Sequence, residues 1–147
     1  MEKIEQYFTE DDYAAMDRAK TFGELVVIAK AVLMRIPKPV VMVCGPMTSG
    51  GTKNIELNFK IFAVYINFLR ENGFNVFTQL PFEKAMWRIM ETPEYRDGDQ
   101  LLEEFYGEIF KSGLIEELHF IPNWETSHGA TWEHKKAEEL GIKIIYF

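Results

Sequence analysis

The sequence predicts an α/β domain built on a parallel sheet, because short apolar runs alternate with longer amphipathic stretches along most of the chain. The first run, residues 40–44, reads Val-Val-Met-Val-Cys and ends at Gly45-Pro46. A continuous apolar run of this length is typical of a parallel strand that is buried on both faces. A chain of 147 residues is long enough for one well-packed domain and too short for two ordinary ones.

The segment 1–36 is predicted to be an amphipathic helical extension that precedes an α/β domain over residues 37–147. Thr21 followed by Glu24 has the form of a capping box, and the apolar residues after it repeat at helical spacing until Pro37.

The rest of the chain continues the alternation of strands and helices. The expected elements are a helix over about 54–71, a strand over 74–78, a short helix over 82–90, a helix over 100–111, a strand over 118–122, a helix over 130–140 and a strand over 142–146. Thr92-Pro93 and Asp97-Gly98 mark a polar loop with the composition of a lid. Strands joined by helices imply a parallel sheet with right-handed crossovers.

Composition excludes several classes of function. The net charge of −7 argues against a nucleic-acid polymer as partner and leaves small anionic ligands open. A single cysteine, Cys44, excludes an internal disulfide framework, and three scattered histidines show no metal-ligand spacing, so we expect no metal and no cofactor. The longest apolar stretch, residues 25–34, contains Lys30 and is too short for a membrane span, and the first residues lack the plan of a secretory signal. We therefore expect a cytoplasmic protein without membrane contact.

The predicted helix over 54–71 carries two apolar stripes. One consists of Ile55, Phe59, Phe62, Ile66 and Leu69, and the other of Leu57, Ile61, Val64, Tyr65 and Phe68. One stripe is enough to cover a sheet, so the other requires a second cover. Either another subunit, in a homo-oligomer, or the N-terminal extension folding back meets this need.

Two loops are candidates for a ligand site. Ligands of open parallel sheets bind beyond the C-terminal ends of the strands, where loops and helix N-termini meet. The first loop, residues 45–54, is rich in glycine and hydroxyl groups but fits neither the Walker A pattern nor the dinucleotide fingerprint. The second, residues 122–133, places a serine, a glycine and a carboxylate at a strand-to-helix turn. A loop that merely turns the chain and an ordinary helix cap are the respective alternatives.

Read together, the two loops resemble those of the nucleoside 2-deoxyribosyltransferase superfamily, which includes deoxynucleoside 5′-monophosphate N-glycosidases. The matching segments are GPMTSGG followed by Asn54, and IPNWETSHGATWE, and the resemblance is to the branch with a GPMTG loop and an LPGWexSxGAxxE segment. It covers roughly residues 39–147. It implies a flavodoxin-like three-layer α/β/α fold with a parallel sheet of about four to five strands, and a small-molecule nucleoside or nucleotide as ligand.

The resemblance also assigns roles to residues. It implies that Glu133 attacks the anomeric carbon, that Ser127 and Gly129 contact the sugar or its phosphate, and that Glu108 is the second acidic group. The first loop would contribute Gly45, Met47, Thr48, Gly50, Gly51 and Asn54 to substrate binding. Glu104, one turn before Glu108, is the substitute for it.

Other residues near the loops have two readings. Trp124 is either a ring on which a base stacks or a packing residue, as is Trp132. Cys44 is expected to be a small buried residue, and His128 receives no role. The first loop has no arginine to hold a phosphate, although Lys53 is a substitute. Asn123 stands where the branch usually has glycine.

These residue types suit the breaking of an N-glycosidic bond. Positive charge builds on the sugar ring as the bond breaks, so a carboxylate beneath the anomeric carbon stabilises it and can form a covalent glycosyl intermediate. We expect a nucleoside or nucleotide N-glycosidase or a 2-deoxyribosyltransferase. The alternatives are a non-catalytic nucleotide-binding or sensing module of the same fold, and an oligomeric scaffold.

Overall fold

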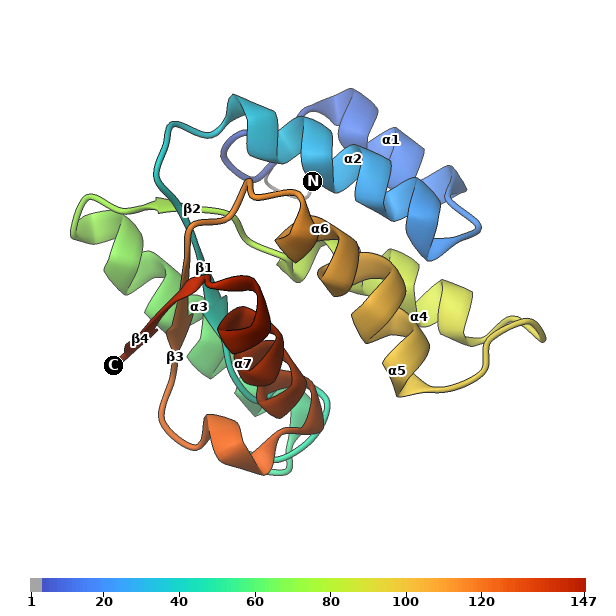
Figure 1. Cartoon of the computed structure of the whole chain (residues 1–147). Coiled ribbons are helices and arrows are strands. Elements are labelled where there is room, and N and C mark those ends of the chain that lie inside the picture. The colour runs from blue at the N-terminus through green and yellow to red at the C-terminus, as the bar shows by residue number, and fades with distance from the viewer. Residues whose placement is uncertain (1–3) are drawn as a thin grey trace.

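Four parallel strands form the centre of the computed structural model, which describes residues 4–147 (Figure 1). They are β1 (Val40–Cys44), β2 (Asn75–Val76), β3 (Glu117–Phe120) and β4 (Lys143–Tyr146). Their order in the sheet is β2-β1-β3-β4, and each neighbouring pair is parallel. The predicted α/β fold is confirmed, with four strands in a flavodoxin-like three-layer arrangement.

Helices cover the two faces of the sheet unequally. One face carries α3 (Ile55–Glu71), whose buried side chains pack on Val41 and Val43. The helices on the other side of the sheet are α1 (Glu10–Arg18), α2 (Phe22–Arg35), α4 (Glu83–Met90), α5 (Gly98–Leu101), α6 (Glu108–Lys111) and α7 (His128–Leu140). Met42 and Cys44 point toward this second layer. Because β1 is buried on both faces, it reads as a continuous apolar run.

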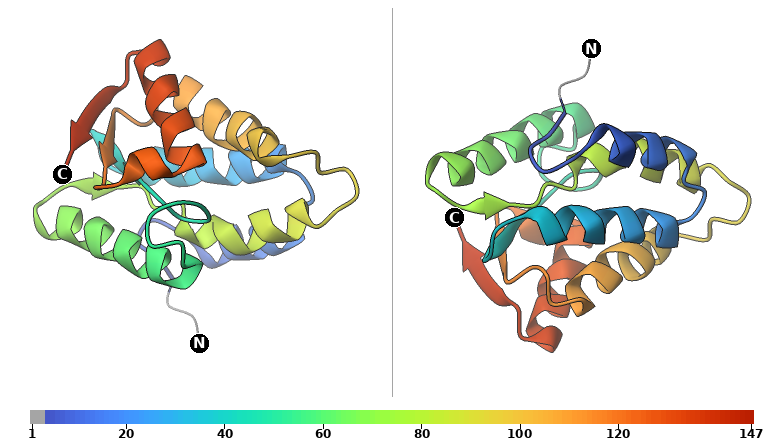
Figure 2. Two further views of the ribbon diagram at one scale, coloured as in Figure 1. Left: turned by 90° about the horizontal axis from the view of Figure 1, so that it is seen from below. Right: turned by 90° about the horizontal axis from the view of Figure 1, so that it is seen from above.

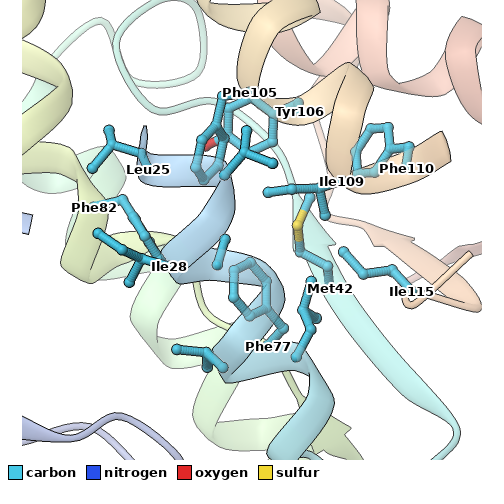
Figure 3. Packing of buried hydrophobic residues seen from close by; sticks show 14 of the residues in the cluster. Leu25, Ile28, Met42, Phe77, Phe82, Phe105, Tyr106, Ile109, Phe110 and Ile115 are labelled. Atoms are coloured by element: carbon cyan, nitrogen blue, oxygen red, sulfur yellow. The ribbon is translucent and has the colours of Figure 1, made fainter. Parts of the chain in front are cut away.

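The helical extension consists of two helices rather than one. Thr9 caps α1, where its hydroxyl accepts a hydrogen bond from the Asp12 N–H at 3.1 Å, and Thr21 caps α2 in the same way. Helix α2 packs into the larger core, as Figure 3 shows for Leu25 and its neighbours Phe82 and Phe105. The predicted helical character is confirmed for Glu10–Arg18 and Phe22–Arg35, whereas residues 4–9 are not helical; residues 1–3 lie outside the described residues.

The second apolar stripe of α3 stays exposed in part, because Ile61 and Tyr65 pack against the core while the other three residues do not. Leu57, Val64 and Phe68 are 45%, 65% and 52% exposed, respectively. The extension packs on the opposite side of the sheet (Figure 1), so residues 4–36 do not cover this stripe. The homo-oligomer therefore stays a prediction, whereas the fold-back alternative is wrong for these residues.

The predicted helix over 100–111 is present but irregular. Residues 98–111 form one continuous helical segment in which Leu102–Gly107 is a π-helix between α5 and α6. A π segment accommodates an extra residue in the helix, so it shifts the faces of the residues that follow.

Most other element boundaries lie close to the predicted ones. Strand β2 is the exception, with two residues instead of five, although the Phe77 N–H still donates to the Val41 carbonyl at 2.9 Å. Short 3₁₀ turns at Leu80–Phe82 and Trp124–Thr126 complete the chain. None of the helices formed by residues 4–147 has the length and apolar content needed to cross a bilayer.

Candidate functional site

A cavity of about 350 Å³ opens beside the C-terminal end of β1, next to the first turns of α7. This is the place where the strand order reverses, between β1 and β3, and it is where open parallel sheets bind ligands. Figure 2 shows the loop after β1 lying between α4 and the turn that precedes α7. The polar side chains that line the cavity include Thr48, Ser49, Glu83, Ser127, His128 and Glu133, and the apolar and aromatic ones include Met47, Trp87, Met90, Tyr95, Leu102 and Tyr106.

Glu133 is a buried carboxyl in this cavity. It lies in the second turn of α7 and is only 6% exposed. Burial raises its pKa to about 8, a hydrogen bond from the Cys44 thiol opposes the rise, and the charge on Glu83 adds to it. Burial, the charge of Glu133 and the hydrogen bond to it raise the pKa of the thiol, so Cys44 serves as a neutral donor beneath the carboxyl.

Glu83 is a second carboxyl in the same cavity, and the sequence analysis missed it. It is half-buried in the first turn of α4, where burial raises its pKa to about 7, while a hydrogen bond with Trp87 lowers it. Tyr106, from the π-helix, is also buried here, and its pKa is raised by burial and by the charges of both glutamates. A glutamate in the first turn of a helix is too common to have stood out in the sequence.

Ser127 begins α7 and faces the cavity. Its hydroxyl accepts a hydrogen bond from the Ala130 N–H at 3.2 Å, and its carbonyl accepts one from the Thr131 hydroxyl at 2.7 Å. The serine therefore caps the helix and lines the cavity at once, so the cap is confirmed, while the contact with a ligand stays a prediction.

Hydrogen bonds join the two loops. The Ser49 hydroxyl accepts from the His128 N–H at 3.3 Å, and the Thr126 hydroxyl accepts from the Gly51 N–H at 2.7 Å. Asn123, in the turn before Thr126, has a φ of 71°, a left-handed conformation that glycine and asparagine adopt most readily. This explains why asparagine is tolerated where the similar branch usually has glycine.

Asn58 organises the first loop from α3, and it was not predicted. It is 3% exposed, and its Nδ2 donates to the carbonyls of Met47 and Gly50 at 3.1 and 3.2 Å. Its Oδ1 accepts from the N–H and the hydroxyl of Thr52 at 3.1 and 2.8 Å. One side chain thus holds the loop at three points.

The structure brings six of the predicted residues to the cavity. These are Gly45, Met47, Thr48, Ser127, Gly129 and Glu133. Gly129 is notable because a Cβ built on it would make only ordinary contacts, the nearest at 3.8 Å to Leu102. Protein packing therefore does not require a glycine at this position, and its hydrogen atom leaves room on the cavity side.

Four predicted binding residues lie elsewhere. Gly50 packs so closely on the backbone of Thr126 that a Cβ would overlap it, and Gly51 lines a separate cavity of about 260 Å³ beside Asn58. Asn54 caps α3, accepting the Leu57 N–H at 3.0 Å. The ring of Trp124 stacks on that of His134, with 4.2 Å between the ring centroids and 7° between the ring planes, and Trp132 stacks on Phe110. Both tryptophans are thus packed against protein side chains, so the packing interpretation holds for them.

The predicted second acid, Glu108, does not reach the cavity. Its side chain is 49% exposed and pairs with Lys111 at 3.7 Å. The substitute, Glu104, is 44% exposed and pairs with Arg96 at 3.2 Å. The resemblance assigned Glu108 by its position in the sequence alone, and the structure, in which Glu108 follows a π-helix, leaves this side chain at the surface.

The cavity offers anionic and neutral groups. Among the described residues, neither lysine nor arginine lines it, and Lys53 stands exposed on the loop outside. His128 has its Nε2 2.8 Å from the Asp99 carboxylate. Within residues 4–147, histidine, cysteine and acidic side chains nowhere gather in a set of three that would hold a metal ion.

Comparison with known proteins identifies a family for this chain. The sequence pattern of the family described as a domain of unknown function (DUF4406) matches residues 39–146, which include both loops and all four strands. Neither the curated proteins nor the solved structures gave a match. Because the match spans well over half of the chain, the protein belongs to the DUF4406 family.

Proposed function

We propose that this protein breaks the N-glycosidic bond of a nucleoside, with Glu133 as the nucleophile. The observation that carries the proposal is the buried Glu133 carboxyl, lining a cavity at the switch point of the sheet beside a helix N-terminus. An isolated carboxyl is costly to bury, so its retention in a cavity is typical of a group with a chemical task.

The walls of the cavity fit the two halves of a nucleoside. Aromatic and thioether side chains, among them Trp87, Tyr106 and Met47, provide flat and adaptable surfaces for a base. Hydroxyl groups of Thr48 and Ser127 provide partners for a sugar. Small-molecule sites generally combine an apolar lining with a few polar groups of this kind.

The charges of the cavity favour a nucleoside without a 5′-phosphate. Glu83 and Glu133 line the cavity, while no lysine or arginine among the described residues lines it. A phosphate dianion in this cavity would meet the negative charge that the two glutamates share, without a lysine or arginine to pair with, and is therefore disfavoured. The unphosphorylated nucleoside is therefore the preferred substrate in this proposal, and a 5′-monophosphate is the poorer one.

Hydrolysis and transfer share the first chemical step. Glu133 attacks the anomeric carbon and the base departs, after which either water or a second base takes up the sugar. A panel of nucleosides and their 5′-monophosphates, incubated with and without an acceptor base, distinguishes the two by chromatography of the products.

The Glu133→Gln variant tests the assignment of the nucleophile. It keeps the size of the side chain and removes the attacking carboxylate, so release of free base should cease. Glu108→Gln is the matched control, because it makes the same change on an exposed side chain and should leave activity intact. Unchanged base release by Glu133→Gln refutes the proposal. Thermal stabilisation by nucleosides without any turnover of the wild-type protein supports the binding module instead.

A further inference from the structure

The cavity contains a second carboxyl, Glu83, to which the proposed attack by Glu133 assigns no role. Glu83 reaches it from α4, whereas Glu133 reaches it from α7, so the two come from separate elements. The Trp87 side chain, one helical turn after Glu83 and lining the same cavity, forms a hydrogen bond with that carboxyl. Because the indole has a single N–H donor, this bond engages at most one carboxylate oxygen at a time.

The two glutamates are electrostatically linked. Burial is the main reason that the pKa of Glu133 rises to about 8, and the charge on Glu83 adds to this rise. After burial, the charges of both glutamates also raise the pKa of Tyr106. Glu83 itself has a pKa of about 7. The groups that face the pair are therefore the Cys44 thiol, the Tyr106 hydroxyl and the Trp87 indole, all neutral, and no cation among the lining residues compensates them. Because the pKa of Glu133 is the higher of the two, a single proton near neutral pH rests mainly on Glu133, and the form needed for attack is the one in which this proton has passed to Glu83.

We propose that Glu83 is the catalytic acid and base that works with Glu133. The inference rests on the proposed N-glycosidic function of the same cavity. A departing base needs a proton, because an unprotonated base is a poor leaving group, and a carboxyl with a pKa near neutrality is suited to supply it.

The proton and the electron pairs balance over two steps. In the first, a Glu133 oxygen forms a bond to the anomeric carbon, the bond from that carbon to the base nitrogen breaks with its electron pair on the base, and the proton of Glu83 passes to the base. In the second, water attacks the anomeric carbon, its proton passes to the Glu83 carboxylate, and Glu133 leaves as a carboxylate. The products are the free base and the free sugar, and Glu83 is protonated again.

The other groups of the cavity are less suited to this role. Burial and the two carboxylate charges keep the Tyr106 hydroxyl protonated, so it can orient a substrate but not exchange a proton near neutral pH. The Cys44 thiol is fully buried and its hydrogen bond is directed at Glu133. Glu83 alone combines a cavity-facing position, partial exposure and a pKa of about 7.

Two probes with different leaving groups test the assignment. The first is 2′-deoxyadenosine, whose base must be protonated as it leaves, and the second is 4-nitrophenyl 2-deoxyriboside, whose nitrophenolate leaves without a proton. The variants are Glu83→Gln, Glu83→Asp, Glu133→Gln and, as a control in the same helix neighbourhood, Glu91→Gln at the exposed C-cap of α4.

Glu83→Gln should cleave the deoxynucleoside with a kcat/KM about 10²- to 10⁴-fold lower, because a missing general acid costs this much, and should release the first equivalent of nitrophenolate with a kcat/KM close to that of the wild type. Later turnovers of the nitrophenyl probe should slow, because the second step has lost its base. Glu83→Asp should recover part of the loss on the nucleoside. Glu133→Gln should lose both activities, and Glu91→Gln should lose neither. Circular dichroism checks that each variant is folded.

The outcomes separate this inference from the proposed function. If folded Glu83→Gln cleaves the nucleoside at the wild-type rate while Glu133→Gln is inactive, the role of Glu83 is overturned and the proposed function still stands. Equal losses in kcat/KM on both probes in Glu83→Gln also overturn the role of proton donor. A wild-type protein that cleaves neither probe overturns the function and this inference together.

Discussion

Replacing Glu133 by glutamine should stabilise the protein against unfolding at alkaline pH, although the same change should abolish activity. The side chain is 6% exposed, and burial is the largest cause of the rise in its pKa from an ordinary 4.5 to about 8. A carboxyl with a raised pKa binds its proton more tightly in the folded than in the unfolded chain. Its contribution to stability therefore falls as the pH rises above about 4.5, and the loss is complete above about 8.

The magnitude follows from the two pKa values. The difference between a pKa of 4.5 and one of about 8 corresponds to a free-energy cost of about 5 kcal/mol for ionising the buried carboxyl, at about 1.4 kcal/mol for each pKa unit. Glutamine has no charge to bury, so the variant avoids this cost. Relative to the wild type, Glu133→Gln should gain about 1 kcal/mol at pH 5, about 3 kcal/mol at pH 7 and about 5 kcal/mol at pH 9 in the free energy of unfolding.

Urea unfolding followed by circular dichroism at these three pH values measures the difference. Glu108→Gln is the control, because its side chain is 49% exposed and pairs only with Lys111 at the surface, so no such trend is expected. A stability difference between Glu133→Gln and the wild type that stays the same from pH 5 to pH 9 would refute the reasoning, since it would mean that no carboxylate is buried at this position.

Three further changes test the loops and the extension. Gly50 and Gly113 both have a left-handed φ, of 70° and 75°, but only at Gly50 would a Cβ overlap a neighbouring backbone. In thermal unfolding, Gly50→Ala should therefore lose at least about 1 kcal/mol more stability than Gly113→Ala. Equal losses would contradict the close approach of the loops. Gly129→Ala should leave the melting temperature unchanged or higher, because alanine favours a helix and its Cβ has room there. Nucleoside affinity, measured by calorimetry, should weaken about tenfold because the added methyl group crowds the cavity. A clear loss of stability would argue against the open space at Gly129. Asp12→Asn should lower the free energy of unfolding by about 1 to 2 kcal/mol at pH 7, since it breaks the 2.6 Å ion pair with the partly exposed Arg35. Burial raises the pKa of Asp12, but its hydrogen bonds outweigh burial and lower the pKa overall. The stabilisation by Asp12 is therefore lost as the pH falls through this lowered pKa, and the deficit of the variant should vanish in acid. A deficit equal at pH 7 and pH 2.5 contradicts the ion pair.

The candidate site shows where counting along a sequence fails. Ser127, Gly129 and Glu133 follow one another within a single regular helix start, so their spacing alone places them on one side of a cavity. Glu108 was assigned from the resemblance by its position in the sequence, which does not say which way a side chain faces once a π-helix precedes it. The second carboxyl that lines the cavity is Glu83, from a different helix.

The sequence by itself determined the α/β class, the parallel sheet and the positions of the two candidate loops. These properties depend on local patterns: an apolar run for a strand buried on both faces, caps at helix starts, and glycines where the chain turns. Hydrogen bonds between residues a few positions apart, such as that from the Ala130 N–H to the Ser127 hydroxyl, can be inferred from such local patterns as well.

Only the tertiary structure decided which distant residues share the cavity and which apolar surface stays exposed. Glu83 and Glu133 are fifty residues apart in the sequence, and their electrostatic link exists only because α4 and α7 converge on the end of β1. Asn58 likewise acts on a loop that precedes its own helix, and Phe68 stays exposed because the extension packs on the other side of the sheet. Burial and long-range charge depend on how the elements are packed, and no pattern within one element encodes them.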